Sequence, residues 1–236
     1  MTEGLMEPAT AGRRVLVWDL PTRIFHWLLV GAFAGTWLTS DERSWLDVHA
    51  RFGYTLLALV AFRIAWGLAG TRHARFASFV RGPRAVAAYL HSLVAGRPQH
   101  HAGHNPAGGW AILALLVLAL VAGASGLATW LGGEALEDLH EAAATAMLVV
   151  AAVHVAGVVL GSLAHRENLV RAMVTGYKRA RPGGGIGGPR RAVAALLVAA
   201  VAIVWSAPIP VPGPPETVTA VKAGKRDLRH AGRHRD

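Results

Sequence analysis

The amino-acid sequence predicts an all-α integral membrane protein, built as a four-helix transmembrane bundle with a fifth C-terminal transmembrane helix. Two observations lead to this fold class. Of the 236 residues, 53% are hydrophobic and only 16% are charged, whereas about a quarter of the residues are charged in typical soluble domains. The apolar residues are also gathered in runs of roughly 20, which is long enough to cross a bilayer core about 30 Å thick.

Five apolar segments are expected to form the membrane helices, and they comprise residues 20–39, 48–69, 106–130, 139–163 and 192–211. The first follows Asp19 and has Pro21 in its first turn, a combination typical of a helix start. We do not expect it to be a signal peptide, because Trp18, Asp19 and Arg23 interrupt the apolar run and no A-x-A-like site follows. The fifth segment is the weakest, because prolines gather at its C-terminal end.

Charges in the connecting segments predict how these helices are oriented. Residues 71–105 hold five arginines and no acid, and residues 164–191 hold seven basic residues and one acid. Residues 40–47 and 131–138 are acidic instead. Because basic segments stay on the cytoplasmic side, the N-terminus is expected to face the cytoplasm. The same rule accounts for the net charge of +10 without a nucleic-acid partner.

The chain is expected to divide into five parts along its length. These are a cytoplasmic N-terminus (1–19), a four-helix domain (20–177), a basic glycine-rich linker (178–191), the fifth helix (192–211) and a basic tail (212–236). The stretch GGGIGG at 183–188 lacks the preceding strand and the spacing of a nucleotide-binding motif, so we expect a flexible linker. Basic residues flank the fifth helix on both sides, which leaves the side of the tail open.

The cysteine and histidine content narrows the chemistry. The chain has no cysteine, which excludes disulfides, iron–sulfur clusters and covalent haem attachment. Eight of its 12 histidines lie in loops or the tail, where they can simply be solvated. The other four fall within or at the ends of the predicted helices: His26, His49, His140 and His154. An ionisable group at membrane depth is costly and points to function, although any single one could equally be a structural histidine between helices.

The spacing of His140 and His154 predicts two sites at different depths. Fourteen residues of helix place the two side chains roughly 21 Å apart along the axis and within about 40° of the same azimuth. They therefore share one face but cannot bind the same ion. In the predicted orientation His26 lies in the inner half, at the depth of His154, and His49 lies near the outer surface, level with His140.

Each pair can hold a flat macrocycle between opposite imidazoles. Without cysteine, non-covalent bis-histidine haem b is the best chemical match, and six-coordinate iron suits electron transfer. We therefore expect His26 and His154 to ligate an inner haem iron, and His49 and His140 to ligate an outer one. Arg63 follows His49 by 14 residues. It is expected near the inner site, either as the partner of a haem propionate or as an arginine that snorkels to the headgroups.

Four stretches of the sequence together resemble a known family. They are VWDLPTRIFHW, HARFGYTLLALVAFRIAWGL, GHNPAGGW and LHEAAATAMLVVAAVHV. They are similar to the bacterial cytochrome b561 family, which includes the b-type cytochrome subunits of nickel–iron hydrogenases. The resemblance covers about residues 14–177 and implies a four-helix bundle in the bacterial inner membrane, with two b-type haems that exchange electrons with quinone. The ligating histidines of the family fall on the four positions selected above.

Two parts of the chain are left without a role by this resemblance. GHNPAGGW, at residues 103–110, matches the family, but its residues suggest nothing beyond the start of a helix. The region after Tyr177, with its fifth helix and basic tail, is not part of the common four-helix core. We expect that region to dock a partner.

The expected function is electron transfer between the quinone pool and a redox partner, either a hydrophilic redox subunit or an extracytoplasmic cytochrome. No catalytic acid, base or nucleophile is expected, and the sequence leaves open whether the chain is itself a quinone-linked oxidoreductase. One alternative is the membrane anchor and electron-transfer subunit of a hydrogenase- or dehydrogenase-type complex. An alternative of another class is a histidine-based proton or metal-ion transporter, although the first four helices lack acids apart from Glu141 and show no broken-helix repeat. A purely structural anchor is the last alternative.

Overall fold

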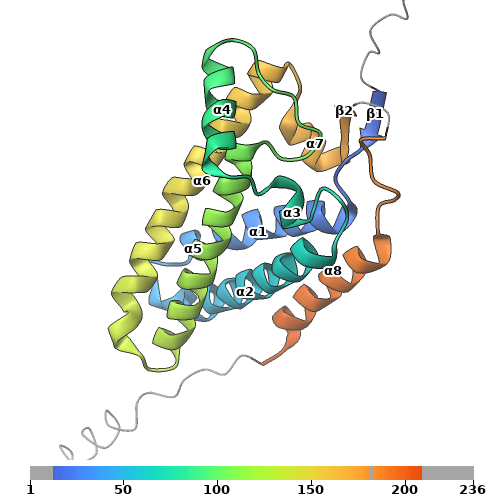
Figure 1. Ribbon diagram of the computed structural model, residues 1–236. Coiled ribbons are helices and arrows are strands. Elements are labelled where there is room, and N and C mark those ends of the chain that lie inside the picture. The colour runs from blue at the N-terminus through green and yellow to red at the C-terminus, as the bar shows by residue number, and fades with distance from the viewer. Residues whose placement is uncertain (1–12, 181–182, 209–236) are drawn as a thin grey trace, which may run out of the picture.

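The computed structural model describes residues 13–180 and 183–208, and these residues are mostly helical (Figure 1). Four long helices follow the predicted segments: α1 (Leu20–Leu38), α2 (Leu46–Ala69), α5 (Pro106–Trp130) and α6 (Glu137–His165). The helical class is confirmed, and each helix ends within two residues of its predicted position. The basic tail and the last residues of the predicted fifth helix lie outside the described residues.

Within residues 13–180 and 183–208, three helical segments are long and apolar enough to cross a membrane: Arg43–Ala69, Pro106–Trp130 and Glu137–His165. The helix α1 has 19 residues and is not among these three segments. The helix α8 (Arg191–Ser206) has 16 residues, about 24 Å of helix, which is less than the roughly 30 Å of a bilayer core. The structure thus supports several membrane helices, while a total of four or five remains a prediction.

Side-chain caps set the starts of α1 and α5. The carboxylate of Asp19 accepts a 2.7 Å hydrogen bond from the backbone N–H of Thr22, as predicted for the start of α1. The amide oxygen of Asn105 accepts an equivalent 2.7 Å bond from Gly108 at the start of α5. Each helix also has a proline in its first turn, where no intrahelical donor is needed.

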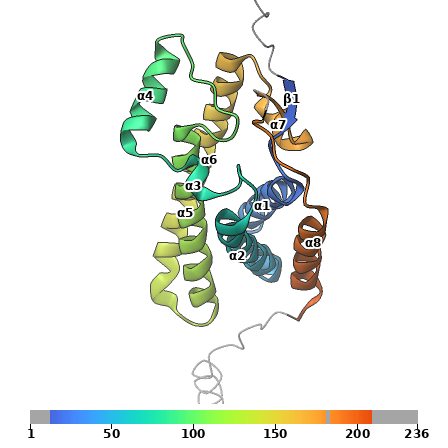
Figure 2. The same cartoon turned by 45° about the vertical axis from the view of Figure 1, so that its right-hand side comes forward.

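The helices lie in three layers, which are clearest in Figure 2. The α5–α6 hairpin forms one layer, the α1–α2 hairpin the next, and α8 packs on the outer side of α1 and α2. The main core lies between these layers and consists of Phe25, Ala32, Leu56, Leu59, Val60, Leu116, Ala119, Met147 and Leu197. Met147 is the contribution of α6 to this core, and most other apolar side chains of α6 are exposed. A helix that is apolar on its exposed face is typical of a membrane span.

The helix α8 is fastened to α2 by polar and aromatic contacts. The guanidinium of Arg51 donates to the carbonyl of Trp205 at 3.0 Å. The indole N–H of Trp205 donates to the hydroxyl of Thr55 at 3.1 Å, and its ring meets that of Phe52 edge to face at 5.0 Å between centroids. These contacts therefore fix the C-terminal end of α8 against α2.

One end of the bundle carries elements that the sequence did not predict, and we call it the sheet end. Its strands β1 (Arg13–Leu16) and β2 (Tyr177–Ala180) pair antiparallel, with Arg13 opposite Ala180. Three short helices also lie at this end: α7 (Leu169–Thr175) contacts β2, α3 (Phe76–Phe79) contacts α2, and α4 (Pro83–Val94) packs against α5. Two 3₁₀ turns, Arg43–Trp45 and Glu134–Leu136, precede α2 and α6. The strands have only four residues each, which is too short for an alternation of apolar and polar residues to predict them.

The segment predicted as a flexible linker is held by hydrogen bonds where the structure describes it. The backbone N–H of Ile186 donates to the carbonyl of Leu16 at 2.8 Å. The imidazole of His73 donates through Nε2 to the carbonyl of Gly184 at 2.8 Å. Residues 183–188 therefore lie along β1 and the segment after α2, and they position α8.

Candidate functional site

His49 on α2 and His140 on α6 lie ring to ring between the two helical hairpins. Their ring centroids are 6.1 Å apart and the ring planes meet at 78°. Two imidazoles bound to opposite sides of one metal at about 2 Å per bond place their centroids about 6 Å apart, once about 1 Å from each nitrogen to its ring centre is added. The separation in this predicted pair therefore fits a metal ion between the rings.

Both rings of this pair are oriented by backbone carbonyls. The Nδ1 atom of His49 lies 3.0 Å from the carbonyl oxygen of Thr36 on α1, and that of His140 lies 2.8 Å from the carbonyl oxygen of Ala122 on α5. Because a carbonyl only accepts, Nδ1 carries the proton and Nε2 keeps the lone pair that a metal needs. All four long helices thus contribute, two with rings and two with carbonyls.

A glycine on α5 makes room for the ring of His140. A Cβ atom at Gly126 would lie 2.7 Å from Nδ1 and 2.8 Å from Cε1 of that ring. Gly126 is therefore required for His140 to approach α5 closely enough to reach the carbonyl of Ala122. Sequence reasoning missed this glycine, because its role depends on the register between α5 and α6.

The second predicted pair consists of His26 on α1 and His154 on α6. The two side chains lie close enough to influence each other electrostatically. The ring of His26 meets the ring of Trp27 edge to face at 5.3 Å between centroids. Within the described residues neither ring of this pair bonds to a backbone carbonyl, which distinguishes it from the His49/His140 pair.

The donor set of the two pairs fits haem b. The described part of the chain holds no group of three or more histidines and acids that could bind a metal ion. Each pair therefore offers two imidazoles and no third side chain, whereas a structural zinc site needs four protein ligands. A haem would take its other iron ligands from the macrocycle, so the two imidazoles of a pair would be enough to hold it.

Arg63 on α2 is buried at the sheet end of the bundle. Its side chain is only 2% exposed, and its guanidinium lies over the rings of Phe76 and Phe79, at 4.9 and 5.7 Å from their centroids. In the described part of the chain, the Nη1 atom of Arg63 has no hydrogen-bond partner. An arginine that snorkels would expose its charged end at the headgroups, so the snorkelling alternative for Arg63 is wrong.

His104, in the GHNPAGGW stretch, is not one of the solvated loop histidines that the sequence suggested. Its ring packs between Trp18 and Phe79, with centroid distances of 4.4 and 4.8 Å. Its Nδ1 atom is buried and has no hydrogen-bond partner among the described residues. Burial holds the pKa of His104 well below its ordinary value of 6.5, and the nearby charges of Arg63 and Lys178 lower it further. The imidazole is therefore neutral at pH 7. A position directly before a helix start inside a family motif was the only sequence signal for it.

Asp19 joins the start of α1 to the end of α2. It is 1% exposed, and besides capping α1 its carboxylate accepts a 3.1 Å hydrogen bond from the indole of Trp66 and another from the hydroxyl of Thr71. The carboxylate also acts electrostatically on Arg63. The sequence identified Asp19 as a helix cap but not as the centre of this polar contact.

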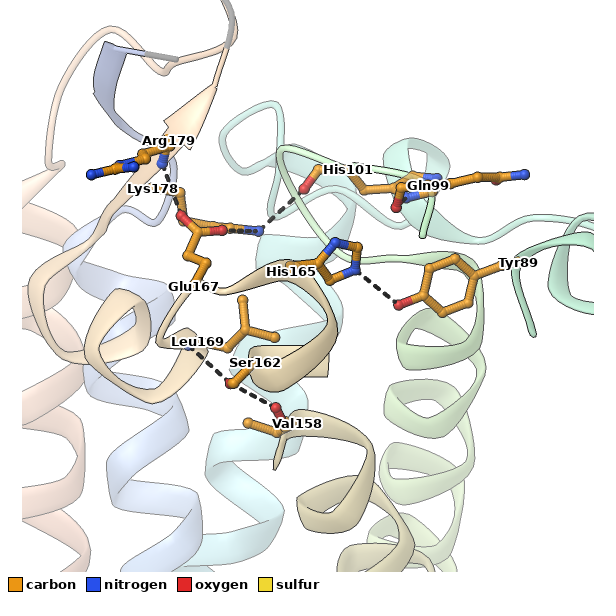
Figure 3. A network of polar contacts seen from close by, with 10 residues as sticks. All are labelled: Tyr89, Gln99, His101, Val158, Ser162, His165, Glu167, Leu169, Lys178 and Arg179. Carbon is orange, nitrogen blue, oxygen red and sulfur yellow. Dashed lines mark hydrogen bonds and ion pairs between the residues drawn. The ribbon is translucent and has the colours of Figure 1, made fainter. Parts of the chain in front are cut away.

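A polar network fastens the loop that precedes α5 to the rest of the sheet end (Figure 3). The ammonium of Lys178 on β2 donates to the carbonyl of His101 at 3.1 Å and lies 3.8 Å from the carboxylate of Glu167. Burial lowers the pKa of Lys178, and Glu167 partly restores it. The hydroxyl of Tyr89 on α4 lies 3.5 Å from Nε2 of His165. These contacts fix the backbone just before His104.

Comparison with known proteins identifies the family. The model of one family, described as prokaryotic cytochrome b561, matches residues 17–176. This range contains both histidine pairs, Arg63 and His104, and it ends just before β2. No curated protein and no solved structure matches the chain. The chain belongs to the prokaryotic cytochrome b561 family and is a multi-pass bacterial membrane cytochrome that binds haem b and serves electron transfer.

Proposed function

We propose that this chain is a di-haem cytochrome that transfers electrons between membrane quinone and a second redox partner. In this proposal His49 and His140 ligate one haem iron, and His26 and His154 ligate the other. The observation that supports it is the His49/His140 pair, whose rings are 6.1 Å apart and whose Nδ1 atoms face backbone carbonyls, which leaves the lone pair on Nε2. Family membership favours electron transfer over the histidine-based transporter.

The bound haems supply one-electron redox chemistry, and the residues of the chain set its conditions. Two imidazoles per iron leave no open position, which suits electron transfer rather than oxygen activation. The carbonyls of Thr36 and Ala122 hold the ligand rings in one orientation and raise their basicity. His140 and His154 lie on one helix about 21 Å apart, so the proposed haems lie at two depths and connect the two sides of the membrane.

Haem quantification tests the di-haem proposal directly. The full chain, purified in detergent, is expected to contain two b-type haems, seen in reduced-minus-oxidised spectra. His154→Ala is expected to lose one haem and to keep the one held by His49 and His140. A wild-type chain without haem would overturn the proposal, and loss of both haems from a folded His154→Ala chain would overturn the pairing.

Reduction by quinol tests the proposed substrate. A short-chain quinol added to the oxidised chain is expected to reduce the haems within seconds, and the reaction is expected to saturate with quinol concentration. A reduction rate that rises linearly without saturation, as with a small chemical reductant, would argue against a quinol site.

A second candidate function is the membrane anchor of a larger redox complex, and α8 favours it. This helix lies beyond residues 17–176 of the family match and keeps an exposed apolar face that includes Leu196, Val198 and Ile203. Removal of residues 183–236 tests it, with copurification as the readout. The anchor function predicts that a hydrophilic redox subunit copurifies with the full chain and is lost from the shortened one, while both keep their haems.

A further inference from the structure

Two buried polar atoms at the sheet end have no hydrogen-bond partner among the residues that the structure describes, and they belong to neighbouring side chains. They are Nη1 of Arg63 and Nδ1 of His104. Both side chains pack on the ring of Phe79, at 5.7 Å from the guanidinium carbon and 4.8 Å from the imidazole centroid. Arg63 from α2 and His104 from the segment before α5 therefore belong to one cluster. Each side chain has a nitrogen that is free to donate a hydrogen bond to a ligand.

The first of these groups is a buried charge without an ion pair. Arg63 is 2% exposed, and within the described residues it has no carboxylate at ion-pair distance. Asp19 is close enough to act on its charge, but that carboxylate is occupied by Trp66 and Thr71. Contact with aromatic faces covers only part of a guanidinium. Because a buried charge is costly unless an anion and hydrogen bonds compensate it, this position calls for an anion.

The second group adds a neutral donor beside that charge. The imidazole of His104 is uncharged at pH 7 because burial keeps its pKa well below the ordinary value. Trp18 fixes the ring from the side opposite Phe79. Phe25, next to His26 on α1, packs against Phe62, next to Arg63 on α2, with ring centroids 6.3 Å apart. The cluster therefore lies at the level of the His26/His154 pair, whereas His49 is 14 residues from Arg63 on α2, about 21 Å of helix.

We propose that Arg63 and His104 together bind a propionate carboxylate of the haem that His26 and His154 hold. This inference rests on the proposed function, because it requires a haem at that pair. The guanidinium donates through Nη1 and the imidazole through Nδ1, which satisfies both unpartnered atoms with charge-assisted hydrogen bonds. The carboxylate in turn neutralises the buried charge of Arg63.

The reduction potential of each haem tests this proposal. A cation near one haem favours its reduced form, which carries one positive charge less. Arg63→Gln is therefore expected to shift the equilibrium of that haem about tenfold toward the oxidised form, about 59 mV for a one-electron couple. His104→Phe keeps the aromatic packing but removes the donor, and it is expected to give a smaller shift in the same direction. The affected haem is the one that His154→Ala loses.

Two control variants separate this role from general effects of charge and folding. Arg75→Gln removes an exposed arginine at the same end and is expected to leave both potentials unchanged. Arg63→Lys keeps the positive charge but replaces the planar guanidinium by an ammonium. It is therefore expected to keep the reduction potential near that of the wild type and to alter the hydrogen bond to the propionate carboxylate. It also keeps the test informative if Arg63→Gln does not fold.

Infrared difference spectra between the oxidised and reduced chain identify the anion. With haem labelled with ¹³C at the propionate carboxyls, a labelled carboxylate band is expected to shift in the Arg63→Lys and His104→Phe variants and to stay unchanged in Arg75→Gln. A labelled band that none of the variants moves would overturn the proposal and leave a lipid or a free anion at Arg63. A wild-type chain without haem would instead refute the proposed function, so the two failures are distinguishable.

Discussion

Adding one methyl group at Gly126 is expected to remove one haem and leave the other. In Gly126→Ala the new Cβ would lie 2.7 Å from Nδ1 of His140, whereas ordinary contact begins at 3.4 Å, so the ring must move by roughly 0.7 Å. Overpacking of this kind costs about 1–3 kcal/mol, and loss of the 2.8 Å bond to Ala122 costs about 0.5–1.5 kcal/mol more. The sum, about 1.5–4.5 kcal/mol, corresponds to a roughly 10- to 2,000-fold weaker affinity for haem at the His49/His140 pair.

The assay is haem content per chain after purification, with low-spin electron paramagnetic resonance signals to separate the two haems. Gly126→Ala is expected to lose the signal that His49→Ala also loses, and to keep the signal that His154→Ala loses. Ala124→Val is the matched control, because it adds bulk at an exposed position of the same helix and is expected to keep both haems. If Gly126→Ala kept both haems with unchanged affinity, the close approach of His140 to α5 would not matter for ligation.

Two further predictions concern stability. Burial holds the pKa of His73 below its ordinary value of 6.5; its bond to Gly184 opposes this shift, and the charges of Arg72 and Lys178 add to it. The unfolded chain therefore binds more protons than the folded chain just below pH 6.5. The free energy of unfolding consequently falls as the pH decreases through that range. His73→Gln is expected to flatten this acid limb in thermal unfolding at a series of pH values, and an unchanged limb would exclude His73 as its source. Trp205→Phe removes the indole donor to Thr55 but keeps the ring near Phe52, and it is expected to lower the free energy of unfolding by about 0.5–1.5 kcal/mol. Trp45→Phe, at a 52% exposed tryptophan, is expected to change it little, and equal losses in the two variants would refute a specific role for the Trp205 bond.

The positions of the helices followed from the sequence because local signals determine them. Apolar runs set their length, and Asp19 marks the start of α1 through a cap that needs only three residues. The pairing of histidines was also predictable in outline. Helical rise fixes the depth of a residue, so His49 and His140 were expected at one level, and the structure brings their rings together.

The contacts around the histidines could not be predicted from the sequence, because they depend on how the helices pack. The carbonyl of Ala122 meets His140 only at one register of α5 against α6, and no residue pattern encodes that register. His104 was missed for a related reason. Its loop has no periodicity, and Trp18, far away in sequence, is brought against the ring by the pairing of β1 with β2.

The arrangement of the ligands gives the cofactors a structural role that can be tested. In each pair one histidine belongs to the α1–α2 hairpin and the other to α6. The helix α6 packs along α5 and contributes Met147 to the main core, while most of its other apolar side chains are exposed. Two haems bound as proposed would therefore act as the main cross-links between α6 and α1–α2.

Removal of haem is accordingly expected to loosen α6 more than α1 or α2. A ligand that binds only the folded chain stabilises it by an amount that rises with its concentration relative to its dissociation constant, and here that stabilisation is concentrated where the ligand joins two layers. In hydrogen exchange of the haem-free chain, the amides of α6 between His140 and His154 are expected to lose protection. The amides around Leu59 in α2 are expected to stay protected, because the main core that contains Leu59 is formed by apolar side chains and needs no cofactor. Reloading haem is expected to restore the protection of α6. Equal loss of protection in α2 and α6 would show instead that the whole bundle depends on the haems, and the three-layer packing of apolar side chains would then be insufficient to hold even the α1–α2 hairpin.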